Sequence, residues 1–289
     1  MTLLQMHVFL AIARTGSFTK AGETLNLTQS AVSQTLAGLE AEAGLTLFHR
    51  GKTGVTLTDA GTTLLPYARE MLRSEERFGQ AAASLKGLQT GSLTIGCFPS
   101  FMAGHMPELI KGFRDRYPGL SVAFREGNYD EIHGWLLDGT VDVGFNVYAK
   151  PPLRFIPLMD DPMRVVMPKD HPFAKRKEVS VDELLSEPFV RDTGCEHYLA
   201  QLFPDPSRQP NDQFGVRDTF AILSMVQAGL GITVLPRMSV PAKGFDVRTC
   251  ELKPRLVRTI GLSLHARRAL SPGAEALIRH VAESFKNAG

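Results

Sequence analysis

A run of small and uncharged polar residues near the N-terminus carries side chains that could read DNA. Between positions 29 and 43 the apolar residues recur at steps of four and three, which predicts a helix with one buried face. The opposite face is polar, uncharged and small: Ser30, Ser33, Gln34, Ala37 and Ala41. Serine and glutamine can bond base edges and phosphate oxygens. The alternative is a polar face that meets water, although such faces are usually rich in glutamate and lysine.

The surrounding segments predict the elements that would position this helix. Two shorter amphipathic helices precede it, with Gly16 ending the first, Ser17 capping the second, and Asn26 in the turn before Thr28. A hairpin is predicted after it, across the turn at residues 51–54. Two basic residues lie near the tip of this hairpin, Arg50 and Lys52. Their charges suit the phosphate backbone of nucleic acid.

A long helix is predicted from Asp59 to about Leu88. Its apolar residues alternate in steps of four and three, which is the pattern of a helix–helix dimer interface. The seam consists of Leu64, Ala68, Met71, Glu75, Phe78, Ala82 and Leu85. The alternative is a single helix packed on its own domain. Pro66 lies inside the helix and predicts a bend there.

The remaining two thirds of the chain alternate between strand and helix patterns. Strands at 93–98, 121–125 and 141–145 are separated by helices, and this order predicts a parallel sheet. Further strands are predicted at 164–167, 189–190, 232–235 and 260–265, before a last helix at 272–286.

Several of these segments together resemble one family. The motifs are Phe9-Leu10-Ala11-Ile12-Ala13, Gly16-Ser17-Phe18-Thr19, Leu25-Asn26-Leu27-Thr28-Gln29-Ser30-Ala31-Val32-Ser33-Gln34, Leu39-Glu40, Leu47-Phe48-His49-Arg50 and Leu57-Thr58-Asp59-Ala60-Gly61. They are similar to the signature of LysR-type transcriptional regulators. The sequence departs from it at Gln34, where many members carry arginine.

The resemblance implies a multidomain chain. The expected parts are a winged helix-turn-helix DNA-binding domain at 1–58, a linker and dimerisation helix at 59–90, and an effector-binding domain at 91–289. The effector domain is expected to have the α/β fold of periplasmic solute-binding proteins, with lobe I at 91–160 and 266–289 and lobe II at 161–265. The DNA-binding residues are expected to be Thr28, Gln29, Ser30, Ser33, Gln34, Arg50 and Lys52. Gln29, Ser33 and Gln34 would contact bases, whereas Ser30 and Arg50 would hold phosphates.

In such a fold a ligand lies between the lobes, near strand ends and helix N-termini. The candidates at those positions are Ser100, Phe101, Asn128, Tyr129, Asn146, Thr193, Gly194, Cys195, Thr219 and Phe220. Each could instead be an ordinary cap or loop residue. Ser100 follows the first strand, where its hydroxyl and nearby N–H groups could hold a carboxylate. The aromatic candidates would suit a ligand with an apolar part, so the expected effector is a small carboxylate or aromatic acid.

The expected function is a sequence-specific transcriptional regulator controlled by that effector. Its partners would be double-stranded DNA, further copies of the chain in a homodimer or homotetramer, and RNA polymerase if it activates. The chain has no motif of a common catalytic site, so no enzyme activity and no cofactor are expected. With no secretory signal and no apolar run long enough for a bilayer, a cytoplasmic location without membrane contact is expected.

Cys195 leaves one alternative open, a redox-sensing regulator switched at this thiol. Similar regulators that sense oxidants use a cysteine in this region, typically with a second one nearby, whereas here the next is Cys250. The triplet Cys195-Glu196-His197 is too small a set for a metal site, so no metal is expected. A formal net charge of +2 neither requires nor excludes nucleic acid.

Overall fold

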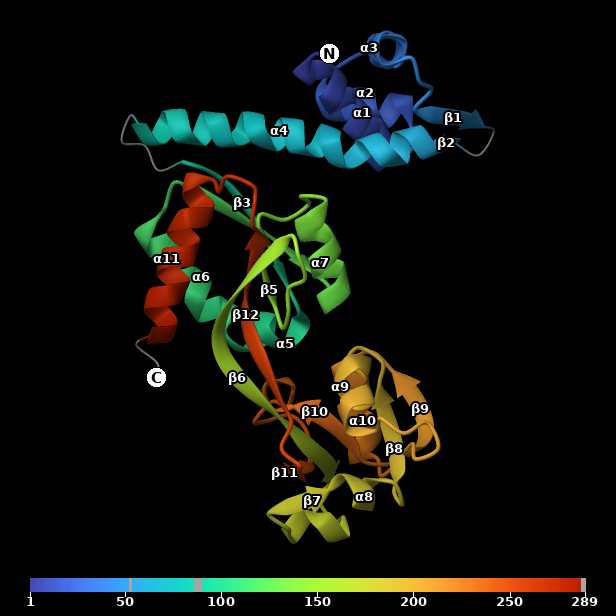
Figure 1. The fold of residues 1–289 in the computed structure, drawn as a ribbon, viewed down its shortest axis with the longest axis vertical. Helices are drawn as coiled ribbons and strands as arrows, with labels where there is room; N and C mark the ends of the chain where they lie inside the picture. Colours follow the sequence, from blue (N-terminus) through green and yellow to red (C-terminus); the bar gives the residue numbers. More distant parts are fainter. Residues whose placement is uncertain (52–53, 86–89, 287–289) are drawn as a thin grey trace.

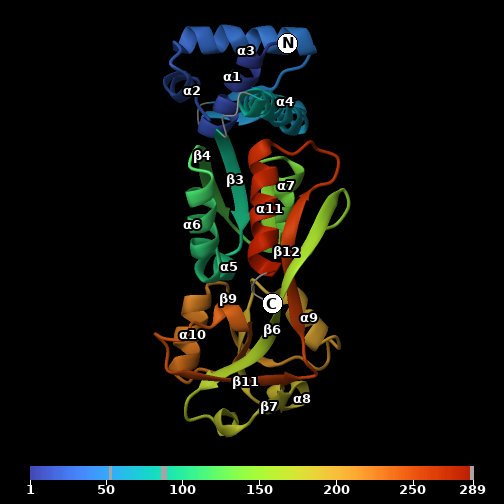
Figure 2. The same ribbon diagram turned by 90° about the vertical axis from the view of Figure 1, so that its left-hand side faces the viewer.

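The computed structural model describes residues 1–51, 54–85 and 90–286. Three bodies follow one another along the long axis of the molecule (Figures 1 and 2). The N-terminal domain lies on the long helix α4, lobe I of the effector domain lies beneath this helix, and lobe II forms the opposite end. Among the described helices none is both long and apolar enough to cross a bilayer.

The N-terminal domain has three helices and a two-stranded hairpin. The elements are α1 (Leu3–Thr15), α2 (Phe18–Leu25), α3 (Gln29–Ala43), β1 (Phe48–Gly51) and β2 (Gly54–Leu57). The buried face of α3 consists of Val32, Leu36 and Leu39, which pack with Phe9 and Ile12 of α1. This is the face that the spacing predicted; winged helix-turn-helix architecture is therefore confirmed.

The predicted caps of this domain are also confirmed. The hydroxyl of Ser17 accepts a hydrogen bond from Lys20 N–H, and Asn26 adopts a left-handed φ of 54°. The turn into α3 passes very close to Gly22 of α2. A Cβ at Gly22 would be only 2.6 Å from the carbonyl oxygen of Leu27. The turn between α2 and α3 therefore requires glycine at this position.

Helix α4 (Asp59–Leu85) begins at Thr58, whose hydroxyl accepts a hydrogen bond from Gly61 N–H at 2.9 Å. The helix runs through Pro66 without interruption. The predicted seam divides into two parts. Ala68 packs in the core of the N-terminal domain, whereas Phe78 is 77% exposed and Leu85 is 91% exposed. Packing on its own domain thus accounts for the first part of the seam only.

Lobe I is built on a parallel sheet of β3 (Gly91–Cys97), β4 (Leu120–Glu126) and β5 (Val143–Asn146), with β3 in the centre. The parallel order predicted from the alternating pattern is confirmed. The helices of this lobe are α5 (Pro99–Gly104), α6 (Met106–Arg116), α7 (Tyr129–Leu137) and α11 (Pro272–Lys286).

Two long strands connect the lobes (Figure 1). β6 (Leu153–Pro168) and β12 (Val257–His265) pair antiparallel. β12 also pairs with β5, and its Ile260 and Leu262 are buried in the core of lobe I. The chain thus rejoins lobe I within β12, although the sequence analysis places residues up to 265 in lobe II. The outer domain boundaries at 58 and 90 stay a prediction.

Lobe II is an α/β body whose elements are β7 (Glu178–Ser180), α8 (Val181–Leu184), β8 (Pro188–Asp192), α9 (Glu196–Leu202), β9 (Asn211–Val216), α10 (Thr219–Gln227), β10 (Thr233–Pro236) and β11 (Val247–Lys253). β10 and β11 pair with the second half of β6, whereas β8 and β9 form a separate parallel pair. The sequence analysis did not predict β7, β9 or β11. The ends of β8 and β9 and the start of α10 face lobe I and help to form the cleft described below.

Candidate functional site

The first candidate site is the outer face of α3. Thr28 caps the helix with its hydroxyl, which accepts from Ala31 N–H at 3.2 Å and lies 3.0 Å from Ser30 Oγ. Gln29, Ser30 and Gln34 are exposed, and Ser33 is half-buried. The side chains that the sequence analysis selected for DNA therefore share an accessible surface around the start of α3.

Arg50 lies on the hairpin next to this helix. Its side chain is exposed and its guanidinium carbon is 4.6 Å from the ring centre of Phe18, the first residue of α2. This cation–π contact holds the charge close to the domain while leaving its N–H groups accessible. Lys52, the other basic residue predicted for the hairpin, lies outside the described residues.

The second candidate site is a cavity of about 410 Å³ between the two lobes. Lobe I contributes residues 98–100, 126–129 and 131, and lobe II contributes residues 192, 194, 195 and 217–219. A volume of this size is in the range of small-molecule sites.

Arg258 of β12 is the central polar residue of this cavity. It is 2% exposed, and its Nε and Nη2 donate to Oδ2 of Asp161 at 2.9 and 2.7 Å. Nη1 donates to the hydroxyl of Tyr129 at 2.6 Å, and Nη2 also donates to Ser100 Oγ at 2.9 Å. The guanidinium carbon is 5.0 Å from the ring centre of Phe98. One buried cation thus ties lobe I to both connecting strands.

Ser100 is in the cavity, but its environment differs from the expected one. Its hydroxyl accepts a hydrogen bond from Arg258, so the serine orients a protein cation. Ser100 is the second residue of α5, which has only 6 residues. The bond from Arg258 uses a lone pair of the hydroxyl, so the hydroxyl proton can still be donated to a ligand.

Tyr129 lies beside Ser100 in the same wall of the cavity. Its burial, opposed by the charge of Arg258, raises the pKa of the phenol well above its ordinary value. The phenol therefore stays protonated and can donate a hydrogen bond of its own.

The cavity brings together six of the ten predicted effector residues. Those that line it are Ser100, Asn128, Tyr129, Gly194, Cys195 and Thr219. Asn128 is also the cap of α7, where its side chain accepts from Glu131 N–H at 2.8 Å. Thr193 lines an adjoining cavity of about 480 Å³ that shares residues 128–129 and 194–195 with the first.

Three predicted residues lie elsewhere. Phe101 is fully buried in the core of lobe I, with its ring stacked 4.5 Å from that of Phe145. Asn146 is also buried, and it donates to the carbonyl of Tyr129 at 3.0 Å. Phe220 is 68% exposed and packs against Phe245 on the outside of lobe II, because the first turn of α10 directs it away from the cavity. Phe101 and Phe220 therefore do not line the cavity, contrary to the prediction, and Asn146 contacts the backbone of Tyr129 instead.

The sequence analysis missed the charged residues of the cavity. These are Glu126, Glu131, Asp192, Arg217, Asp218 and Arg258, with Asp161 behind Arg258. Asp192 could have been predicted in the same way as Thr193, because it is the last residue of β8, where that strand meets the cleft. Arg258 is the second residue of β12, and the only signal was a charged residue in an otherwise apolar segment.

Cys195 is buried beside Asp192. Burial, reinforced by the Asp192 carboxylate, raises the pKa of the thiol well above its ordinary value. A thiol of this kind carries little thiolate, which is the reactive form. Across the described ranges, no group of three or more His, Cys, Asp or Glu side chains is placed to hold a metal ion.

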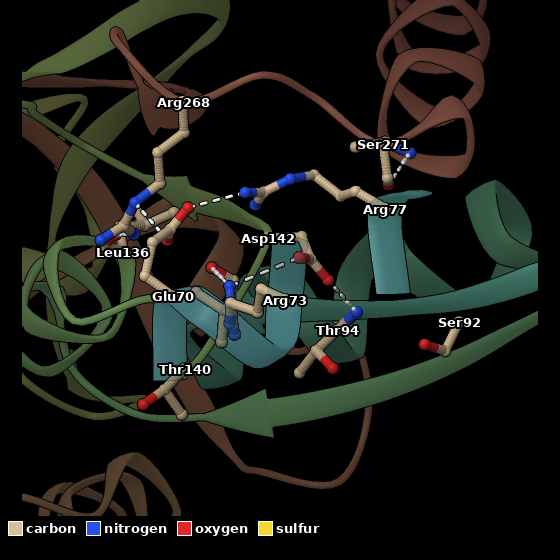
Figure 3. A network of polar contacts seen from close by, with 12 residues as sticks. Glu70, Arg73, Arg77, Ser92, Thr94, Leu136, Thr140, Asp142, Arg268 and Ser271 are labelled. Atoms are coloured by element: carbon tan, nitrogen blue, oxygen red, sulfur yellow. Dashed lines mark hydrogen bonds and ion pairs between the residues drawn. The ribbon is translucent and has the colours of Figure 1, made fainter. Parts of the chain in front are cut away.

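A polar interface connects α4 to lobe I (Figure 3). Arg73 forms an ion pair with Asp142 at 3.4 Å, and the other oxygen of Asp142 accepts from Thr94 N–H at 2.8 Å. Glu70 lies between two arginines, with Arg77 at 2.7 Å and Arg268 at 2.8 Å. These contacts are partly shielded from water, and burial lowers the pKa of Arg73.

Further contacts extend this interface along α4. Arg69 pairs with Asp138 at 2.5 Å, and Gln80 donates to the carbonyl of Ser92 at 3.0 Å. The linker helix thus contacts lobe I over several turns.

Comparison with known proteins matches both halves of the chain to one family. Residues 3–62 match the family of bacterial regulatory helix-turn-helix proteins of the lysR type, and residues 86–286 match the LysR substrate binding domain. The HTH-type transcriptional regulator YvbU of Bacillus subtilis is 36% identical over 289 residues, covering 99% of each chain.

Two solved structures have the same fold. A full-length OxyR variant from Pseudomonas aeruginosa has a TM-score of 0.78 at 22% identity and covers 99% of this chain and 95% of its own. Full-length CbnR in complex with its target DNA has a TM-score of 0.70 at 22% identity, covering 98% of this chain and 100% of its own. The chain belongs to the LysR family of DNA-binding transcriptional regulators and has the effector-binding domain of that family.

Proposed function

We propose that this regulator is controlled by a small molecule that binds in the cavity between lobes I and II and changes how the protein binds DNA. The observation that carries the proposal is the buried cluster around Arg258. Groups from lobe I (Ser100 and Tyr129) and from both connecting strands (Asp161 and Arg258) meet at one wall of an open cavity. A ligand that contacts this cluster and lobe II together would favour one arrangement of the lobes.

The DNA would be contacted by the outer face of α3. Gln29, Ser33 and Gln34 would reach base edges, and Ser30, Thr28 and Arg50 would reach phosphates; this is supported by their position around the exposed start of α3 and the adjacent hairpin. CbnR, which has this fold, has been solved on its target DNA. As a DNA-binding regulator of a bacterial family, the protein would act in the cytoplasm and without catalysis.

The oligomer would form through the exposed half of α4. The stripe formed by Tyr67, Met71, Phe78 and Leu85 is apolar and exposed in the single chain, with exposed fractions of 67%, 38%, 77% and 91%. Burial of such a stripe against a second copy would give a dimer that reads a two-fold symmetric site. A homotetramer and a contact with RNA polymerase during activation are consistent with this arrangement.

A thiol switch at Cys195 is the less favoured alternative. The thiol is 8% exposed, lies against the Asp192 carboxylate and has a raised pKa. These properties suit a wall of the pocket rather than a peroxide-reactive group.

Two measurements on the full-length protein test the proposed function. A thermal-shift screen of small metabolites would find ligands, and DNA binding would then be measured with and without each of them. We expect a ligand that raises the melting temperature to change the affinity of the protein for DNA. Tyr129→Phe should lower the affinity of the protein for that ligand. If ligands that bind the protein never alter DNA binding, or if all of them bind Tyr129→Phe with unchanged affinity, the proposal is wrong.

A further inference from the structure

We infer that the effector carries a positively charged group, such as an ammonium, amidinium or guanidinium, which is held by carboxylates of the cleft. This inference rests on the proposed function, because it assumes that the cavity between the lobes binds the effector. A cationic effector would take the place of the carboxylate effector that was expected from the sequence.

The charges that line the cavity are predominantly negative. Four carboxylates line it, from Glu126, Glu131, Asp192 and Asp218, against two guanidinium groups. Both guanidinium groups already have partners. Arg258 is paired with Asp161 at 2.7 Å, and Arg217 with Glu131 at 2.9 Å.

Three of the lining carboxylates form no ion pair. Within residues 1–51, 54–85 and 90–286, no lysine, arginine or histidine nitrogen lies within 4.0 Å of Glu126, Asp192 or Asp218. An empty cleft with this charge attracts cations and repels anions.

Asp192 is the carboxylate that points most directly to a ligand. It is 4% exposed and lines the cavity at the end of β8. Its Oδ1 accepts a hydrogen bond from Gly194 N–H at 2.8 Å, but it has no ion pair. Burial raises its pKa, which is the sign of a carboxylate that lacks sufficient compensation for lost water. A ligand cation beside it would supply the missing charge.

The cations and the helix N-termini of the cavity that could bind an anion already have protein partners. The N-terminus of α7 is capped by Asn128 and Glu131 in a reciprocal pair of hydrogen bonds, and that of α10 by the Asp218 carboxylate. Arg258 donates to Asp161, Tyr129 and Ser100. A carboxylate ligand could accept from the hydroxyls of Ser100 and Tyr129, but it would have to displace a protein group to reach Arg258 or either helix N-terminus, whereas an amine would displace none.

The test is titration of the full-length protein with matched pairs of probes that differ in charge. The pairs are butylamine with butyrate, 1,4-diaminobutane with succinate, and benzylamine with benzoate, measured by calorimetry at fixed ionic strength. We expect at least one amine to bind at the cleft and its carboxylate counterpart to bind at least about tenfold more weakly, which corresponds to about 1.4 kcal/mol.

Two cleft variants and one control locate the binding. Asp192→Asn should weaken the amine at least tenfold, and Glu126→Gln, at an exposed position where folding is not at risk, should weaken it two- to fivefold. Asp170→Asn removes the same charge from an exposed position of lobe II that does not line the cavity, so it should leave the affinity within twofold.

The outcomes separate this inference from the proposed function. Binding of carboxylates alone, with loss on Tyr129→Phe, would overturn the cationic class and leave the effector cleft in place. An amine that binds Asp192→Asn and Glu126→Gln with the same affinity as it binds the parent would also overturn the cationic ligand class. An amine that binds through Asp192 but never changes DNA affinity would support the ligand class and contradict the proposed function.

Discussion

At the scale of single residues, Arg258 and Asp161 form an ion pair that water hardly reaches, since the two side chains are 1% and 3% exposed. Such a pair contributes little net stability, but removal of one partner leaves the other charge buried alone. We expect Asp161→Asn to lower the free energy of unfolding by about 3–5 kcal/mol. Chemical denaturation followed by circular dichroism would measure the loss.

A double-mutant cycle checks the cause of this loss. Arg258→Gln combined with Asp161→Asn should cost clearly less than the sum of the two single variants, because no uncompensated charge remains. Additive losses would show that the two residues act independently, contrary to the geometry.

Asp192 predicts a dependence of stability on pH. Burial raises its pKa in the folded protein above the value of 3.8 that applies to the unfolded chain. The folded protein therefore retains a proton that the unfolded chain has lost, so its stability falls as the pH rises from 3.8 to the raised pKa and is constant above it. Cys195 and Arg258 are the neighbouring groups that interact with this carboxylate.

The Asp192→Asn variant lacks this titration. Its melting temperature should exceed that of the parent at neutral pH, and the difference should vanish toward acid pH. Asp170→Asn, at an exposed position, serves as the control. A constant difference between Asp192→Asn and the parent at all pH values would contradict a raised pKa.

Gln34 and Arg50 should affect DNA binding in different ways. Gln34→Ala should cost about 1–3 kcal/mol on the preferred site and relax the choice of base at one position. Arg50→Ala should weaken binding to all sequences alike and reduce its dependence on salt. Fluorescence anisotropy with the preferred site and single-base variants, at two or more salt concentrations, would separate these effects. Unchanged preference in Gln34→Ala would mean that α3 docks differently.

At the scale of elements, the sequence predicts best those segments whose pattern is local. The helices of the N-terminal domain have both an apolar period and caps, and Ser17, Asn26 and Thr28 lie where the pattern places them. β9 was missed because five of its six residues are exposed and it has no apolar alternation. Ser100 and Tyr129 were found because they follow strands, whereas Arg258 lies within one, and its direction depends on the pairing of β12 with β6.

The exposed apolar stripe of helix α4 predicts where two copies of the chain associate. Phe78→Glu places a charge on the exposed apolar stripe and should weaken self-association by at least about tenfold, the equivalent of about 1.4 kcal/mol. Gly79→Glu adds the same charge one residue later, where a Cβ meets nothing within 4 Å, and should leave association intact. Sedimentation at several concentrations would measure both, and equal association of parent and Phe78→Glu would place the interface elsewhere.

At the scale of the whole molecule, α4 belongs to both functional halves. Its first turns pack in the core of the N-terminal domain through Ala68, while its later turns form the ion pairs with lobe I shown in Figure 3. A change in lobe I can therefore reach the DNA-binding domain through a continuous helix. Interfaces of this kind transmit binding energy when each ligand prefers one arrangement of the two bodies.

The ion pairs around Arg73 and Arg268 should carry part of that coupling. Asp142→Asn keeps an oxygen for Thr94 N–H but loses the charge that faces Arg73. Arg268→Gln removes the charge of lobe I that faces Glu70 of α4. Both variants should bind the effector and DNA separately with nearly normal affinity. The effect of effector binding on DNA binding, typically about 1–3 kcal/mol, should decrease in each variant.

Arg116→Gln breaks an exposed ion pair with Glu283 on lobe I, away from α4, and should leave the coupling unchanged. DNA titrations with and without saturating effector would give the coupling for all four proteins. If Asp142→Asn and Arg268→Gln couple as strongly as the parent and Arg116→Gln, the signal passes through contacts between subunits rather than through this interface.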